Sequence, residues 1–254
     1  MPSNRVIAMK SRFVDLHLRP PIDQIDKVQM LIEKSAELGY SMVGLTFPTD
    51  VKREHIAHIR KACMDLGLDL VTRVDLTPKN SRELLSALNK VRRKFEVVAV
   101  NCQNKEVYIQ AAKDRRVDLI SSLGDYRRHF FGVSEARLAS EKSAALEINL
   151  TPLLYLGGFR RIQFMSILRR EISSASRFNV PIVLSSGADN PRLLRKPDDY
   201  VFLAYLIGFD PHAAKLALST NPRSIVERNR SKMSPNYICP GVHLVKRGED
   251  CWKG

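Results

Sequence analysis

The feature that most constrains the fold of this chain is a repeat of short β-like runs, each followed by a stretch of helical periodicity. The runs begin near Phe13, Ser41, Asp69, Glu96, Val117, Ala144 and Val180. The first three intervals are 28, 28 and 27 residues, which is the length of one strand, one helix and two short loops. The runs are rich in Val, Ile and Leu, as in strands of a parallel sheet that is buried on both faces. The repeat predicts an α/β protein built from strand–helix units.

The segments between the runs carry apolar residues at helical spacing. We expect helices over residues 22–36, 56–66, 80–94, 104–116, 158–178, 197–208 and 211–231. Gly39 supplies a stop signal for the first of them. Asn80 followed by Glu83 resembles a capping box at the start of the third.

Seven strands alternating with helices favour a distorted (β/α) barrel of the TIM type over an open doubly wound sheet. No eighth strand is obvious, so we expect it to be very short, near Phe209, or missing. Residues 1–232 then form a single barrel domain. Residues 233–254 contain Pro235, Pro240, Gly241 and Gly248, which predicts an extended C-terminal tail.

The composition limits the classes of function. The chain has 254 residues, no apolar run near the ~20 residues that cross a bilayer, and no apolar core of signal-peptide length at its start. We therefore expect a cytoplasmic protein. The four cysteines are scattered without a Cys-x-x-Cys pair, which argues against a disulfide framework or a zinc ribbon. The 41 Lys and Arg against 27 Asp and Glu give a net charge of +14, which favours a polyanionic partner such as nucleic acid.

One group of cations lies where local helix stability does not favour positive charge. These residues begin predicted helices or follow predicted strands, so in a barrel they share the rim at the strand C-termini. They are Lys52, Arg53, Arg127, Arg128, His129, Arg160, Arg161, Arg192, Arg195 and Lys196. Cations at a helix N-terminus oppose the helix dipole, so an anionic partner explains them better than folding does. Tyr126 and Phe130 beside the arginines near residue 127 add surfaces for base stacking. We predict an RNA-binding rim.

A second basic group has an alternative explanation. Its members follow helix C-termini, where cations are favoured by the dipole, or lie on the last helix, where they can form a solvated face. They are Arg92, Arg93, Arg115, Arg116, Arg228 and Arg230. We treat this group as a secondary contact with RNA or with a protein partner.

Polar residues at the predicted strand ends are the candidates for chemistry, because barrel enzymes place catalytic groups there. They include Asp15, His17, Arg73, Asp75, Asn101, Ser121, Glu147, Asn149, Ser185 and Ser186. Residues 15 and 17 alternate along one strand, so we expect them to face the same side, as paired metal ligands would. A metal-dependent phosphoesterase using Asp15, His17, Asp75 and Glu147 is therefore an alternative function. The other histidines do not fall at strand ends, so we favour a buried hydrogen-bonded cluster of Asp15, His17 and Glu147, with no metal site and no catalytic residue.

The chain resembles the family of archaeal ribonuclease P protein component 3, which is homologous to the thirty-kilodalton subunit of the eukaryotic enzyme. The resemblance is carried, in the expected order, by residues 13–20 (FVDLHLRP), 117–121 (VDLIS), 147–154 (EINLTPLL), 181–188 (PIVLSSGA), 203–209 (LAYLIGF) and 222–230 (PRSIVERNR). It extends over residues 12–245.

The resemblance implies a barrel related to the polymerase–histidinol-phosphatase hydrolases, acting as one protein subunit around a catalytic RNA that removes the 5′ leader of precursor tRNA. It implies ribonuclease P RNA, protein component 2, other protein subunits and precursor tRNA as partners. No cofactor is implied for this chain, and magnesium is expected for the RNA holoenzyme. Of the paired histidines on strand one of those hydrolases, only His17 is matched, because position 15 is Asp. A protein-interaction scaffold whose charge only aids solubility is a third hypothesis.

Overall fold

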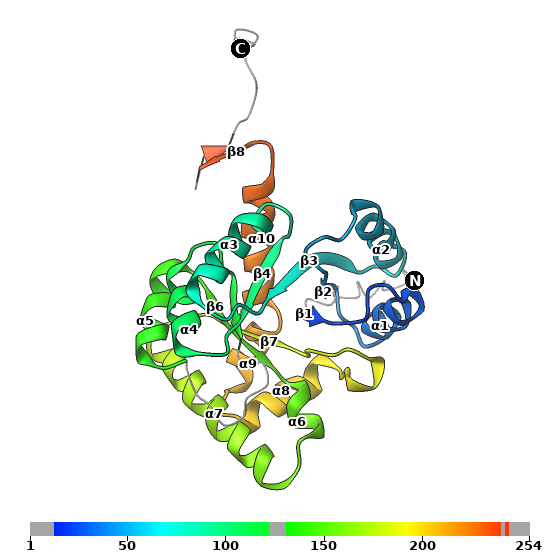
Figure 1. The fold of residues 1–254 in the computed structure, drawn as a ribbon. Coiled ribbons are helices and arrows are strands. Elements are labelled where there is room, and N and C mark those ends of the chain that lie inside the picture. The colour runs from blue at the N-terminus through cyan, green and yellow to red at the C-terminus, as the bar shows by residue number, and fades with distance from the viewer. Residues whose placement is uncertain (1–12, 122–130, 240–241, 244–254) are drawn as a thin grey trace, which may run out of the picture.

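The computed structural model describes residues 13–121, 131–239 and 242–243. Seven strands alternate with helices along the chain (Figure 1). The strands are β1 (Val14–Leu18), β2 (Met42–Thr46), β3 (Asp69–Leu76), β4 (Val97–Asn101), β5 (Leu119–Ser121), β6 (Ala145–Asn149) and β7 (Ile182–Ser185). The helices are α1 (Ile25–Glu37), α2 (Arg53–Asp65), α3 (Ser81–Val91), α4 (Lys105–Lys113), α5 (Val133–Lys142), α6 (Thr151–Tyr155), α7 (Gly158–Arg177), α8 (Pro197–Leu206), α9 (Pro211–Ala217) and α10 (Thr220–Met233), with a 3-10 turn at Pro191–Leu193.

The strands form one parallel sheet in the order β1 to β7, and the sheet curls into a nearly closed barrel (Figure 1). Closure occurs where the C-terminal end of β1 meets the residues after β7. Leu18 bridges Ala188, Gly187 N–H donates to His17 O at 3.0 Å, and Arg19 N–H donates to Ala188 O at 2.7 Å. The predicted distorted seven-stranded barrel is confirmed.

No eighth strand forms near Phe209, which lies between α8 and α9 within the described residues. The junction of α9 and α10 fills the gap at the other end of β1 and β7. Val14 N–H donates to Leu218 O at 2.8 Å, and the Asn221 side-chain amide donates to Ile182 O at 2.8 Å. In a continuous helix, Leu218 O would instead accept from residue 222, which is Pro222 and has no N–H. The helix that we expected over 211–231 is therefore broken in two.

Two apolar layers make the core. The larger lies between the strands and the surrounding helices. The smaller fills the barrel and comprises Val14, Leu16, Met42, Val71, Val97, Ala99, Leu119, Ala145 and Val183, together with Ile225 and Val226 of α10. Helix α10 thus covers the end of the barrel where the strands begin. Ordinary alternation along the strands other than β1 assigns their residues to these two layers.

Local signals account for several element boundaries. The Asn80 side chain accepts from Glu83 N–H at 2.9 Å, as the capping pattern predicts, whereas the Glu83 carboxylate accepts from Lys79 N–H. Helix α10 ends at Met233, one residue beyond the predicted end of the barrel domain. A two-stranded antiparallel hairpin of β8 (Tyr237–Cys239) and β9 (Val242–His243) follows it. Among the described residues, no helix combines the length and the apolar character of a membrane span.

Candidate functional site

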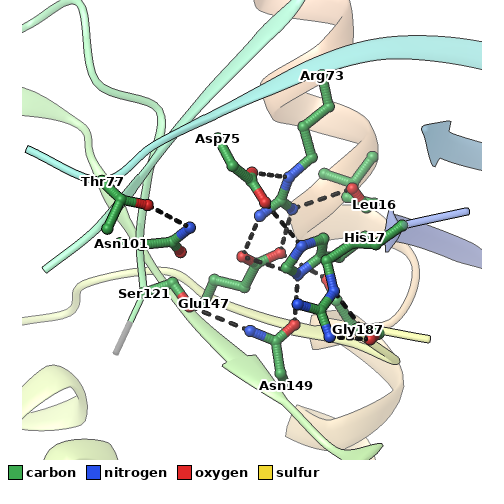
Figure 2. A network of polar contacts seen from close by, with 12 residues as sticks. Leu16, His17, Arg73, Asp75, Thr77, Asn101, Ser121, Glu147, Asn149 and Gly187 are labelled. Carbon is green, nitrogen blue, oxygen red and sulfur yellow. Dashed lines mark hydrogen bonds and ion pairs between the residues drawn. The ribbon is translucent and has the colours of Figure 1, made fainter. Parts of the chain in front are cut away.

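A layer of polar side chains lies inside the barrel at the C-terminal ends of the strands (Figure 2). It is formed by residues that follow the inner apolar layer along each strand: His17, Arg73, Asp75, Asn101, Ser121, Glu147, Asn149 and Ser185. This is the end of the barrel where TIM-type enzymes carry their active sites.

Arg73 is the centre of this layer, and its side chain is fully buried. Its guanidinium contacts Glu147 through two hydrogen bonds of 2.5 and 2.6 Å, Asp75 Oδ1 at 2.7 Å and Leu16 O at 3.0 Å. Burial lowers the pKa of Arg73, but the carboxylates of Asp75 and Glu147 outweigh that effect and raise the pKa above its ordinary value. Arg73 therefore stays charged within the barrel.

The two carboxylates are held in their ionised forms by the same contacts. Burial raises the pKa of Asp75 and of Glu147, but the nearby positive charge of Arg73 outweighs burial, and His17 lowers both pKa values further. Both pKa values consequently lie below the ordinary range. A single buried cation, Arg73, thus pairs with both carboxylates of the cluster.

His17, Asn149 and Ser121 extend the network (Figure 2), and Ser185 completes it. His17 Nε2 lies 2.9 Å from Asp75 Oδ2, and its Nδ1 lies 2.6 Å from Asn149 Oδ1. The Asn149 amide donates to Ser121 Oγ at 3.1 Å, and Ser185 Oγ donates to Glu147 Oε1 at 2.8 Å. These contacts join β1, β3, β5, β6 and β7 across the barrel.

The prediction that Asp15 belongs to this cluster is wrong, although His17 and Glu147 do belong to it. The pairing of β1 with β2 is irregular between Asp15 and Leu18, so Leu16 and His17 both face the interior. Asp15 lies on the other side of β1, where Tyr40 and Tyr200 are its electrostatic neighbours. Its Oδ1 accepts from the backbone N–H groups of His17 and Ser186, both at 3.1 Å. Strict alternation fails because the bulge adds a residue to β1.

The environment of Asp15 differs from that of the interior carboxylates. Its side chain is buried, and Oδ2 has no hydrogen-bond partner among the described residues. Burial raises the pKa of Asp15, and the hydrogen bonds from Ser186 and His17 offset this only in part. Asp15 links β1 to the loop after β7.

The alternative of a metal-dependent phosphoesterase is not favoured. Within the described part of the chain, no group of three or more His, Cys, Asp or Glu side chains could hold a metal ion. The carboxylates of Asp75 and Glu147 are occupied by the guanidinium of Arg73. The residues present therefore do not fit the ligand set of a catalytic metal ion. Val71, Arg73 and Asp75 are alternate residues of β3, a spacing that indicates that all three face the barrel interior. The spacing does not indicate which carboxylates pair with Arg73.

Three parts of the predicted RNA-binding rim lie at the same end of the barrel as the polar layer. Lys52 and Arg53 begin α2, Arg160 and Arg161 lie in the first turn of α7, and the third part, Arg192, Arg195 and Lys196, precedes α8. All are exposed except Arg195, which is partly buried and donates to the carbonyls of Arg192 and Leu194. Among the described residues, no carboxylate forms an ion pair with any of them. Arg127, Arg128 and His129 lie outside the described residues.

The second basic group lies mainly at the opposite end of the barrel and is largely paired. Arg92 and Arg228 both contact the buried Asp118, at 2.9 and 3.1 Å. Arg230 contacts Asp69 at 2.7 Å and Glu96 at 2.6 Å.

The remaining members of the group differ from one another. Arg116 pairs with Asp114 at 2.6 Å, whereas Arg93 and Arg115 are exposed. The paired arginines attach α10 to the barrel and brace the loops beside it, a role that tertiary contacts reveal and spacing along the chain does not.

Comparison with known proteins places the chain among subunits of one enzyme. Residues 12–234 match the family model described as RNase P subunit p30. The chain is 29% identical to Ribonuclease P protein component 3 of Methanosarcina mazei, over 95% of this chain and 98% of that protein. It is 24% identical to the protein of the same name from Methanocaldococcus jannaschii, over 92% of this chain and all of that protein. A chain in a cryo-EM structure of archaeal Ribonuclease P with mature tRNA has the same fold, with a TM-score of 0.78 and 20% identity, covering 93% of this chain and 100% of that one.

Proposed function

The chain belongs to the RNase P subunit p30 family, and we propose that it serves ribonuclease P as an RNA-binding protein subunit. In this function it assists a catalytic RNA in removing the 5′ leader of precursor tRNA, in the cytoplasm. Its own barrel carries no catalytic residue and takes no cofactor, and the magnesium of the reaction belongs to the RNA. The ion pairs of Arg73 with Asp75 and Glu147 support this division of labour, because they engage both carboxylates of the polar layer with a cation of the same chain.

The observation that carries the proposal is the contrast between the two ends of the barrel. Arginines near the strand N-termini, such as Arg92, Arg228 and Arg230, are paired with carboxylates. Lys52, Arg53, Arg160, Arg161, Arg192 and Lys196 stand exposed at the other rim. Several of these begin helices, where cations oppose the dipole. A phosphate backbone is the partner that such unpaired cations fit.

The test of RNA binding is a salt series. Each phosphate that the rim neutralises should add about 0.9 to the slope of log K against log salt for a duplex, or about 0.7 for a single strand. Charge reversal of Arg160 and Arg161 should reduce that slope and lower pre-tRNA cleavage by the reconstituted enzyme. Reversal of Arg93 and Arg115, equally exposed near the other end, is the matched comparison. If the Arg160 and Arg161 variants leave the slope unchanged while the Arg93 and Arg115 variants lower it, RNA binds at the opposite end of the barrel and the proposed rim is refuted.

We assign the contact with protein component 2 to the outer faces of α7 and α8, next to the rim cations Arg160 and Arg161. Helix α8 buries Tyr200, Val201 and Ala204 against the barrel, yet its outer face is also apolar. The large exposed side chains are Phe202, Tyr205 and Leu206 on α8, and Phe159 and Ile162 on α7; each is more than half exposed. Arg169 joins the two helices by donating to Leu206 O at 2.8 Å.

The occupant that this surface fits is a protein. A helix whose outer face carries large apolar side chains is normally covered on that face too, and aromatic side chains with arginine at the border are typical of interface centres. Aliphatic side chains such as Ile162 and Leu206 offer nothing to phosphate. Phe202→Glu should abolish co-purification with component 2, while Met64→Glu, an equally exposed apolar position on α2, should not. Retained binding by Phe202→Glu would exclude this surface.

A further inference from the structure

Arg19 is a further cation at the strand C-terminal end of the barrel, and its position in the sequence did not single it out. It directly follows β1, at the seam where β1 meets the residues after β7. Its Nε and Nη2 atoms donate to Gly187 O at 3.2 and 2.9 Å, and its backbone N–H donates to Ala188 O at 2.7 Å. Gly187 lies beside His17 at the edge of the polar layer (Figure 2). The guanidinium is therefore held in one orientation, at the end of the barrel that α10 does not cover.

The charge of Arg19 is not balanced by a neighbouring carboxylate. Its side chain is partly buried, and it forms no ion pair with any residue of the described part of the chain. A carbonyl oxygen accepts its hydrogen bonds but leaves its charge in place. The carboxylates of Asp75 and Glu147 are engaged by Arg73, and against the effect of burial their pKa values are lowered by Arg73 and His17. Arg19 is thus a cation that the fold fixes in position without supplying an anion.

Arg19 lies between two parts of the predicted RNA-binding rim. Strand β1 pairs with β2 on one side and meets the residues after β7 on the other. The loop after β2 leads to Lys52 and Arg53, and the segment after β7 contains Arg192 and Lys196. Loops that follow neighbouring strands are neighbours around a barrel rim, so Arg19 joins these two groups of cations. TIM-type barrels frequently bind phosphate groups with the loops that follow their last strands.

We propose that Arg19 binds a phosphate group of the RNA backbone. A guanidinium has five N–H donors, of which Gly187 O uses two, so Nη1 and Nη2 retain donors for phosphate oxygens. Paired donors of this kind match the geometry of a phosphate. Gly187 fixes the side chain, and Pro20 and Pro21 restrict the backbone that follows, so binding orders little that is not ordered already. This inference rests on the proposed function, because it adds a ligand for the RNA backbone to the rim.

The test is the salt dependence with which the full chain binds ribonuclease P RNA. Arg19→Met should weaken binding about tenfold or more at a fixed salt concentration, the loss of a hydrogen-bonded charged contact. It should also lower the slope of log K against log salt by about 0.7–0.9, the contribution of one phosphate. Arg19→Lys keeps the charge and loses the paired donors, so we expect it to keep the slope and to bind more weakly than wild type.

Arg223→Met is the matched control. Arg223 is also partly buried, forms no ion pair within the described ranges, and donates to Ser41 Oγ at 3.0 Å. Because Ser41 directly precedes β2, this arginine lies at the opposite end of the barrel. Arg223→Met should therefore leave the slope unchanged, whatever its effect on the Tm. If Arg19→Met lowers the Tm but leaves the slope at the wild-type value, Arg19 serves only to close the barrel and the proposal is refuted.

Failure of this inference is distinguishable from failure of the proposed function. If RNA binding depends on Arg160 and Arg161 but not on Arg19, the phosphate contact of Arg19 alone is refuted. If Arg19→Met lowers the slope while the Arg160 and Arg161 variants do not, the contact of Arg19 stands and the α7 part of the rim is refuted. If the wild-type chain shows no salt-dependent binding of the RNA, both are refuted.

Discussion

Replacing Arg73 by methionine should destabilise the barrel strongly, because Arg73 is the cation that pairs with two carboxylates held largely out of water. Glu147 is fully buried and Asp75 is nearly so, and the guanidinium makes three hydrogen bonds to them. Breaking a buried ion pair by removing one partner costs about 3–5 kcal/mol. For a chain of this length, that loss corresponds to a fall in Tm of roughly 6–20 °C. Thermal and urea unfolding of Arg73→Met at pH 7 measure it.

The cost of Arg73→Met should also depend on pH. In the wild-type chain the pKa values of Asp75 and Glu147 are lowered from their ordinary 3.8 and 4.5. Their stabilisation is therefore present above those ordinary values and is lost as the pH falls through the lower folded-state values. In Arg73→Met, the guanidinium no longer opposes the effect of burial, so the pKa of Glu147 should rise and protonation should relieve the buried charge. The difference in free energy of unfolding between variant and wild type should shrink from pH 7 to pH 4.

A double variant provides the internal check. Arg73→Met with Glu147→Gln removes both charges of the fully buried Arg73–Glu147 pair and leaves only that of Asp75, so we expect it to recover about 1–3 kcal/mol relative to Arg73→Met alone. Arg116→Met is the control, because its pair with Asp114 is partly exposed and should contribute no more than about 1 kcal/mol. A cost of Arg73→Met below about 1 kcal/mol, or a cost that is equal at pH 4 and pH 7, would refute the reasoning.

Three further substitutions test other contacts. Burial raises the pKa of Asp15 above the ordinary 3.8. A raised carboxyl pKa makes folding less favourable as the pH rises above that ordinary value. Asp15→Asn should therefore gain stability relative to wild type between pH 4 and pH 8, measured by urea unfolding. Arg230→Met removes the ion pairs with Asp69 and with the buried Glu96. It should cost about 1–3 kcal/mol, because a buried carboxylate loses a hydrogen bond, and hydrogen exchange should become faster in α10 than in the strands. A methyl group at Gly44 would overlap the carbonyl of Leu16, so Gly44→Ala should cost about 1–3 kcal/mol by calorimetry. An unchanged Tm would show that β1 can shift at its bulge to accommodate the methyl group without cost.

Periodicity along the chain predicted most of the fold, because each strand–helix unit has its own local signal. Runs such as 41–47 and 96–101 are apolar enough to be buried on both faces, which is the property of a parallel barrel strand. The break before α10 was also present in the sequence as Pro222. We did not predict the break from Pro222 alone. Pro222 has no N–H to donate to Leu218 O, and only in the folded barrel does Val14 N–H donate to that carbonyl instead. A short helix such as α5 was not resolved as a separate range, since its apolar face is weak.

The candidate site was predictable only in part. Polar residues at strand ends identified Arg73, Asp75 and Glu147 as members of one rim, because the C-termini of parallel strands meet there. Which of them would pair could not be derived, since the contacts of Arg73 and Glu147 join residues that lie 74 positions apart. The bulge in β1 likewise depends on β2, where Gly44 leaves room for the backbone of Leu16.

The amino-acid sequence was sufficient for the seven strands, most of the helices between them and the excess of positive charge, because propensity, period and composition are local or additive properties. Tertiary structure alone decided which cations remain unpaired. Arg230 and Arg160 are alike in the sequence, but folding brings Asp69 and Glu96 to the first and leaves the second exposed. The reason is physical: an ion pair depends on distances of a few ångströms between side chains, and those distances are set by the closure of the barrel rather than by spacing along the chain.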